Sequence, residues 1–229
     1  MRGKTYDLVV CAGVQAKKWW ANDHPDQDWQ SIQKLLDVLR SVHVRRFVLI
    51  STVDVYPEPS GVDEETPINP SINHAYGRHR YAVEQFVRDS FSPHYIIRLP
   101  GLFGNGIKKN VIHDLMYGHE LQKINPAAIY QYYSLDRIAR DLEKVISENL
   151  RLVNFASEPV STREIIERFF PLVEVGPEAA FKAAYDMRSR YGVLWGSPAP
   201  GYLFSRVEIL NQLAEFLRRQ PRCLDGFRA

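Results

Sequence analysis

Hydrophobic residues follow two periodicities along this chain. Leu8–Ala12, Phe47–Ile50 and Tyr95–Leu99 are short, nearly continuous apolar runs, and Leu152–Phe155 is a weaker fourth. Runs of this length and composition are typical of strands that are buried on both faces of a parallel sheet. The pattern therefore predicts four strands at these positions.

Between these runs, apolar residues recur at steps of three and four, which predicts amphipathic helices. The three clearest cases lie within Ile32–Leu39, Val83–Val87 and Leu135–Ile146. A chain that alternates strand and helix in this way favours an α/β fold, in which right-handed crossovers connect the strands of a parallel sheet.

The strand signals fade after about residue 157. Ser161 with Glu164, and Ser205 with Glu208, match the capping box that opens a helix. Pro177 suits the first turn of a further helix, whereas the glycines and prolines of 191–202 predict a loop. We expect a Rossmann-like domain over residues 1–157, with an insertion around 105–133, and a smaller, mostly helical substrate-binding lobe over 158–229.

Composition excludes several classes of protein. With 229 residues, 45% hydrophobic and 24% charged, the chain is typical of a folded globular protein. Its 29 basic and 27 acidic residues are scattered, which favours neither nucleic acid nor an anionic membrane as a partner. Two cysteines, and no apolar run of membrane-spanning length, favour a cytoplasmic protein without disulfides. The histidines lack the spacing of a metal site.

Polar side chains with catalytic potential follow the strand at Phe47–Ile50. Ser51, Thr52 and Asp54 lie at the carboxyl end of this strand, where open α/β sheets bind ligands. Tyr76 and Arg80 are four residues apart and share one face of a helix. A nearby cation favours the phenolate and lowers a phenol pKa that starts near ~10, which makes tyrosine a usable acid or base.

A tyrosine and an arginine four apart are common by chance, but these two occur with other matching segments. Together with Thr52 and the segment Ile96–Gly104, the pair resembles the extended short-chain dehydrogenase/reductase family, the NAD-dependent epimerases and dehydratases of nucleotide sugars. Tyr6–Gly13 resembles the fourth strand of that family, and Asn154–Ser161 resembles its final strand and turn. The resemblance covers most of the chain and implies a partial Rossmann-like sheet.

The resemblance implies a role for each matching residue. Thr52 corresponds to the residue that hydrogen-bonds the reacting oxygen, Tyr76 to the catalytic tyrosine, and Arg80 to the motif lysine that steadies the phenolate and holds the nicotinamide ribose. Contacts to the cofactor, NAD or NADP, are implied for Ala12, Gly13, Ser51, Pro100, Gly101 and Leu102. Contacts to a nucleotide-sugar substrate are implied for Asp54, Asn110 and Val111.

Three departures from the family pattern matter for the chemistry. Arg80 replaces lysine, and a guanidinium is planar and effectively never loses its proton, so it cannot take part in a proton relay. Asp28 stands where the family often has asparagine. Val53 follows Thr52 where the dehydratases have an acidic residue, which makes dehydration less favoured.

The glycine-rich turn that carries a dinucleotide pyrophosphate is not found in the sequence. The segment Gly104–Gly106 does not replace it, and we interpret it as a simple turn. Because the first strand already resembles the fourth, we expect roughly 60 residues of the family pattern to be missing. Because the glycine-rich turn is missing, we expect this chain alone to bind NAD weakly or not at all. The strand at Leu8–Ala12 would also become an edge that recruits a second copy or a companion chain.

Two hypotheses from different classes remain. In the first, the chain belongs to an NAD(P)-dependent epimerase, dehydratase or reductase of nucleotide sugars and is incomplete without its cofactor-binding part. In the second, it keeps the fold and binds a nucleotide sugar or another protein without turnover.

Overall fold

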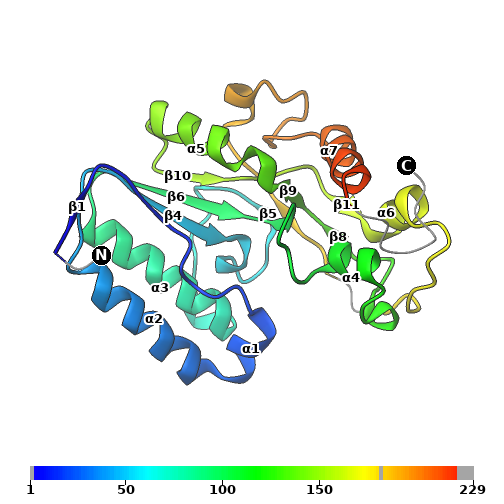
Figure 1. Ribbon diagram of the computed structural model, residues 1–229, viewed down its shortest axis with the longest axis horizontal. Helices are drawn as coiled ribbons and strands as arrows, with labels where there is room; N and C mark the ends of the chain where they lie inside the picture. Colours follow the sequence, from blue (N-terminus) through cyan, green and yellow to red (C-terminus); the bar gives the residue numbers. More distant parts are fainter. Residues whose placement is uncertain (1–2, 181–182, 221–229) are drawn as a thin grey trace. The chain divides into compact units, whose positions relative to one another are not determined.

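The computed structural model describes residues 3–180 and 183–220 (Figure 1). Contacts divide the chain into two compact units. The first comprises residues 1–99 and 142–154, and the second comprises 100–141 and 155–229. Each unit is therefore described by itself.

The first unit is built on a four-stranded parallel sheet in the order β10-β6-β4-β2. Its strands are β2 (Val9–Cys11), β4 (Phe47–Thr52), β6 (His94–Leu99) and β10 (Leu152–Asn154). Strands that follow one another in this series are also neighbours in the sheet, since β2 pairs with β4, β4 with β6 and β6 with β10. The four strands predicted from the apolar runs are confirmed.

Helices cover both faces of this sheet. On one face lie α2 (Pro25–Leu39) and α3 (Ala75–Ser90), while α5 (Ile138–Ser147) lies on the other (Figure 1). The core between the sheet and the α2/α3 layer contains the predicted apolar stripes. Its central members are Ile32, Leu36, Leu39, Val83 and Val87 from the helices, and Val9, Leu49 and Ile96 from the strands.

Shorter elements complete the first unit. They are α1 (Lys18–Asp23), β1 (Thr5–Tyr6), which pairs with β3 (His43–Val44), and β5 (Ser60–Val62). The helix α1 packs on both α2 and α3. It therefore lies beside the N-terminal end of α3, where the predicted catalytic tyrosine is found.

β2 is one of the two edge strands of the sheet, and β10 is the other. Val9 and Cys11 face the core and are buried, whereas Val10 is 47% exposed and Leu8 39% exposed. A parallel strand of this kind is ordinarily covered on both faces. The edge position expected for Leu8–Ala12 is observed, and one apolar face of the strand is left open.

The second unit contains short strand pairs and helices. β7 (Gly101–Phe103) runs parallel to β9 (Tyr132–Ser134), and β8 (Ile129–Tyr130) runs antiparallel to β11 (Val160–Ser161). Its helices are α4 (Val111–Tyr117), α6 (Thr162–Phe169) and α7 (Arg206–Arg218), and β12 (Asp186–Met187) is a further short strand. The Ser161 and Ser205 side chains accept hydrogen bonds from the backbone of Glu164 and Glu208, which confirms both predicted helix starts.

Two local expectations are corrected. Pro177 does not open a helix, because 174–179 has no regular secondary structure. Gly176 N donates to Leu121 O at 3.0 Å, and a Cβ on Gly176 would lie 2.2 Å from Gln122 O, so contact with a neighbouring turn fixes this segment. The predicted loop over 191–202 contains a short 3₁₀ helix, Gly192–Trp195.

In the described part of the chain the α/β class is therefore confirmed, with a parallel sheet and seven α-helices. None of the helices in residues 3–180 and 183–220 combines the length and hydrophobicity that crossing a bilayer requires.

Candidate active site

The carboxyl end of β4 carries three of the predicted polar residues. Thr52 ends the strand, and its hydroxyl accepts a hydrogen bond from Asp54 N at 3.2 Å, which starts a 3₁₀ turn. The Asp54 carboxylate lies 3.5 Å from Thr52 Oγ1 through Oδ2, and its Oδ1 accepts a hydrogen bond from Lys18 Nζ at 2.7 Å. Lys18 was not identified from the sequence.

Tyr76 lies in the first turn of α3, which is held tightly against this strand end. Tyr76 N donates to Asn22 Oδ1 of α1 at 2.9 Å. A Cβ on Gly77 would lie 2.0 Å from Asp54 O, a separation that a side chain cannot adopt. The glycine after the tyrosine therefore allows the helix to approach β4 closely and brings Tyr76 beside Thr52.

Arg80 stacks on Tyr76 but is bound to the protein by several other contacts. Its Cζ lies 3.9 Å from the centroid of the Tyr76 ring. The guanidinium also makes a two-pronged ion pair with Asp28, with N···O distances of 2.5 and 2.9 Å, and donates to Gln15 O at 2.5 Å. Asp28 is 2% exposed and accepts a second partner, His79 Nδ1, at 2.8 Å. The two departures at positions 80 and 28 thus form one buried ion pair.

Opposing effects act on the ionisation of Tyr76. Burial raises the pKa of its phenol above the usual value, and this is the largest effect. Arg80, a hydrogen bond from Thr52, and Lys18 lower the pKa, whereas the Asp54 carboxylate raises it. The expectation that a cation lowers this pKa holds for the contribution of Arg80, but the net direction is upward because burial outweighs it.

His74 is the N-cap of α3, and its Nδ1 accepts a hydrogen bond from Gly77 N at 3.0 Å. Burial, aided by the charge of Lys18, lowers the pKa of His74 from 6.5. A depressed folded-state pKa gives stability that is present above the unfolded value and is lost as pH falls through the folded value. Protonation also removes the acceptor that caps the helix.

We therefore expect the native chain to lose about 1 kcal/mol of unfolding free energy below pH 6.5, a typical value for an N-cap. Urea unfolding between pH 7.5 and 5 should show this loss in the native chain and in His43→Asn, where an exposed histidine is changed. His74→Asn keeps a capping acceptor that does not titrate, so its curve should be flatter. Parallel curves for all three proteins would contradict this account.

Ser51, an implied cofactor contact, is bonded within the core of the first unit. Its hydroxyl donates to Glu84 Oε1 at 2.6 Å, and Glu84 accepts two hydrogen bonds from Arg98, at 3.0 and 2.7 Å. Arg98 in turn donates to the Tyr56 hydroxyl at 2.6 Å, and Asn154 Nδ2 donates to the same hydroxyl at 3.0 Å. The Ser51 side chain is therefore one end of a buried polar network.

The remaining implied cofactor residues belong to different units. Ala12 and Gly13 follow β2 in the first unit and are exposed. Pro100, Gly101 and Leu102 belong to the second unit, where Gly101 N donates to Gln131 O at 3.0 Å. Within one unit, the structure brings Thr52, Asp54, Tyr76 and Arg80 together.

The implied substrate residues Asn110 and Val111 begin α4 in the second unit. Asn110 has φ +127° and caps the helix, accepting from His113 N at 3.0 Å and donating to Leu102 O at 2.6 Å. Val111 lines a cavity of about 270 Å³. The other lining residues are Asp114, Glu120, Lys123, Ile124, Asn125, Ala128, Tyr130 and Ala183. The side chain of Asn110 is thus used to fix the chain, while its neighbour faces the cavity.

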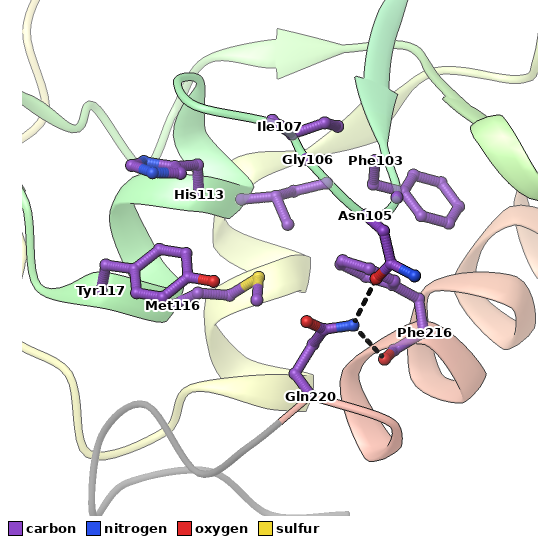
Figure 2. A pocket seen from close by; sticks show the side chains of 11 residues that line it. Phe103, Asn105, Gly106, Ile107, His113, Met116, Tyr117, Phe216 and Gln220 are labelled. Carbon is purple, nitrogen blue, oxygen red and sulfur yellow. Dashed lines mark hydrogen bonds between the residues drawn. The ribbon is translucent and has the colours of Figure 1, made fainter.

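A second cavity in this unit, of about 30 Å³, lies between the segment 103–107, α4 and α7 (Figure 2). Among its lining residues, Gln220 Nε2 donates to Asn105 Oδ1 at 3.1 Å (Figure 2). This volume has room for a water molecule but not for a sugar. Gly104–Gly106 adopts a bend and turn here, as predicted. No grouping of three or more metal-ligating side chains occurs in residues 3–180 and 183–220.

Sequence reasoning missed Lys18, Glu84 and the buried ion pair that Arg98 makes with Glu84. One signal was available for the last, because Arg98 is a charged residue inside an apolar strand, and charged residues are rarely buried without a partner. For Lys18 the sequence offered no signal, since its partner Asp54 is 36 residues away.

The first half of the chain matches a known protein family. The model for the NAD dependent epimerase/dehydratase family matches residues 2–125. A search of curated protein sequences finds no match.

Several solved structures share the fold. The DesIV dTDP-glucose 4,6-dehydratase of Streptomyces venezuelae, solved with NAD and TYD bound, has a TM-score of 0.69 and 18% identity over 95% of this chain and 73% of its own. A dTDP-4-dehydrorhamnose reductase of Clostridium acetobutylicum has a TM-score of 0.62 and 21% identity, and the match covers 91% of this chain and 74% of the reductase. RMD of Pseudomonas aeruginosa, complexed with NADPH, has a TM-score of 0.64 and 19% identity, and the match covers 83% of this chain and 74% of RMD. At these identities the likeness shows the fold.

Proposed function

The chain belongs to the NAD dependent epimerase/dehydratase family, and from this premise we propose that it acts in an NAD(P)-dependent oxidoreductase or epimerase of nucleotide sugars. The observation that carries the proposal is the pairing of Thr52 and Tyr76 at the carboxyl end of β4, with Arg80 over the phenol ring. A hydroxyl and a phenol at this position suit proton transfer to or from a sugar oxygen.

Each residue has a distinct role in this proposal. Tyr76 transfers the proton, Thr52 donates a hydrogen bond to the reacting oxygen, and Arg80 stabilises the phenolate. In the second unit, the cavity at Val111 offers space for part of a nucleotide sugar. Dehydration is less favoured than epimerisation or reduction, because the buried Val53 follows Thr52 where a second acid would be needed.

Cofactor binding fits the described residues only in part. The reacting end of the cofactor would meet Thr52 and Tyr76. Its pyrophosphate needs a row of backbone amides at a helix N-terminus, whereas Ala12–Lys17 after β2 leads into α1, a helix of six residues. Arg80 already donates to Asp28 and Gln15, so its capacity for a ribose hydroxyl is reduced.

We therefore expect this 229-residue chain to bind NAD or NADP weakly or not at all by itself. Isothermal titration should give no saturable heat at micromolar cofactor. Micromolar binding would show that the chain has a second way to hold a pyrophosphate, and would overturn this expectation.

The function is tested by incubating the chain with NAD, NADP or their reduced forms and with UDP- or dTDP-linked hexoses. Nicotinamide absorbance and chromatography of the sugar detect oxidation, reduction or epimerisation. Turnover that depends on Thr52 and Tyr76 supports the proposal. Saturable sugar binding without turnover, even with a complementary cofactor-binding segment added, would favour the non-catalytic alternative.

Partners are expected along β2. Its backbone forms the edge of the sheet, and Val10 and Leu8 are exposed beside it without an interrupting charge or proline. Exposed apolar edges promote strand pairing. We expect a concentration-dependent dimer or larger species in light scattering at tens of micromolar, and Val10→Lys should reduce it. A stable monomer in the native chain would contradict the expectation.

A further inference from the structure

The helix α1 carries two polar residues that both reach the tyrosine site. Lys18 and Asn22 are four residues apart, so they share one face of this helix. Asn22 Oδ1 accepts from Tyr76 N at 2.9 Å, and Lys18 Nζ donates to Asp54 Oδ1 at 2.7 Å. One short helix therefore both holds the backbone of Tyr76 and supplies the cation that pairs with the neighbouring Asp54 carboxylate.

The two cations near Tyr76 differ in exposure and surroundings. Arg80 is 4% exposed and is held between Asp28, Gln15 O and the tyrosine ring. The Lys18 side chain is 39% exposed, and that of Asp54 is 15% exposed. The Lys18–Asp54 ion pair is therefore more exposed to solvent than the Arg80–Asp28 pair.

We propose that Lys18 is a positioning residue for Tyr76, which acts by holding the Asp54 carboxylate in an ion pair. This inference rests on the proposed function, since it describes how the same site is kept ready for proton transfer.

The mechanism follows from competition for a single proton donor. In the chain without substrate, Thr52 has one hydroxyl hydrogen to donate, and both Tyr76 and Asp54 Oδ2 lie near it. While Lys18 holds Asp54 Oδ1 at 2.7 Å, the contact from Thr52 Oγ1 to Asp54 stays long, at 3.5 Å. Without the ammonium, Asp54 would lose this counter-charge, would compete more strongly for the Thr52 hydrogen bond and would oppose formation of the phenolate more strongly.

The charged and titratable groups that face Tyr76 come from every element around it. They are Lys18 from α1, Asp54 from the turn after β4, Arg80 from α3 and the His74 ring at the N-cap, 6.3 Å away. Asp28 and His79 lie behind Arg80. Lys18 is the member of this set that pairs with Asp54, the acidic neighbour that opposes phenolate formation.

The test follows the ionisation of Tyr76 directly and needs no turnover. The full chain is labelled with 3-fluorotyrosine, which brings phenol titration to lower pH, and the ¹⁹F signal of Tyr76 is assigned with Tyr76→Phe. We expect Lys18→Gln to move the titration midpoint of this signal upward and Lys18→Arg to leave it near the native position. Lys17→Gln is the matched control, because it removes the same charge from an exposed neighbour.

A second comparison tests whether Lys18 acts through Asp54. Asp54→Asn should lower the midpoint, and Lys18→Gln should then have a smaller effect than it has in the native chain. An equal shift in both backgrounds, or no difference between Lys18→Gln and Lys17→Gln, would overturn the proposal. If the chain proves inactive but Lys18→Gln shifts the midpoint as expected, the proposed function fails while the role of Lys18 stands.

Discussion

Tyr76→Phe is expected to lower turnover of a nucleotide sugar by about 10²–10⁴-fold, the range that general acid–base catalysis contributes. Because the chain by itself is expected to bind NAD or NADP weakly or not at all, this turnover is measured with a complementary cofactor-binding segment added. The substitution removes the hydroxyl that transfers the proton and keeps the ring on which Arg80 stacks at 3.9 Å. Folding should be little affected, because the backbone of Tyr76 remains bonded to Asn22. Steady-state kinetics should show the loss in kcat, with little change in KM.

Arg80→Lys is the companion variant, because it restores the family residue and keeps the charge. We expect a mild or even activating effect on turnover, because the family residue is restored and the positive charge beside the phenol is kept. Lysine cannot make the two-pronged contact with Asp28 that the guanidinium makes. Adding Asp28→Asn removes the carboxylate that this shorter cation would leave only partly compensated. Unchanged kcat in Tyr76→Phe would show that the assignment of the catalytic tyrosine is wrong.

The strands of the first unit could be predicted from the sequence because each has a short, continuous apolar run, and its main helices because apolar residues recur at steps of three and four. The edge position of β2 could also be predicted, from the order of strands in the family. The short strands of the second unit could not, since runs of two or three residues, such as Val160–Ser161, have no detectable periodicity.

In the candidate site, contacts between residues close in sequence could be predicted, whereas contacts between distant residues could not. Tyr76 and Arg80 are close in sequence and share a helix, so spacing was enough to bring them together. The Asp28–Arg80 and Lys18–Asp54 pairs are separated by 52 and 36 residues. Only the packing of α1 and α2 on α3 decides those pairs. Spacing along the chain therefore predicted the candidate catalytic tyrosine, but not the neighbouring charges that act on its ionisation.

The largest expected loss of stability is in Glu84→Gln. Glu84 is 0% exposed, and its carboxylate accepts hydrogen bonds from Ser51 at 2.6 Å and from Arg98 at 3.0 and 2.7 Å. A glutamine of the same shape would place an amide NH₂ group against one of these donors and leave Arg98, 2% exposed, without its counter-charge. Removing one partner of a buried ion pair costs about 3–5 kcal/mol.

Because whole domains are stable by only about 5–15 kcal/mol, urea unfolding of Glu84→Gln should show a much lower midpoint than that of Asp89→Asn. The latter removes an exposed carboxylate from the same helix and is the matched control. Adding Arg98→Met to Glu84→Gln should recover part of the loss, because a buried pair can be replaced by apolar side chains at little cost. Equal midpoints for Glu84→Gln and Asp89→Asn would mean that the network contributes little to stability.

The recovery in the double variant should be incomplete, because Arg98→Met also removes the hydrogen bond from Arg98 to the buried Tyr56 hydroxyl. That hydroxyl keeps its contacts with Asp63 O and Asn154, so only part of the recovery should be lost.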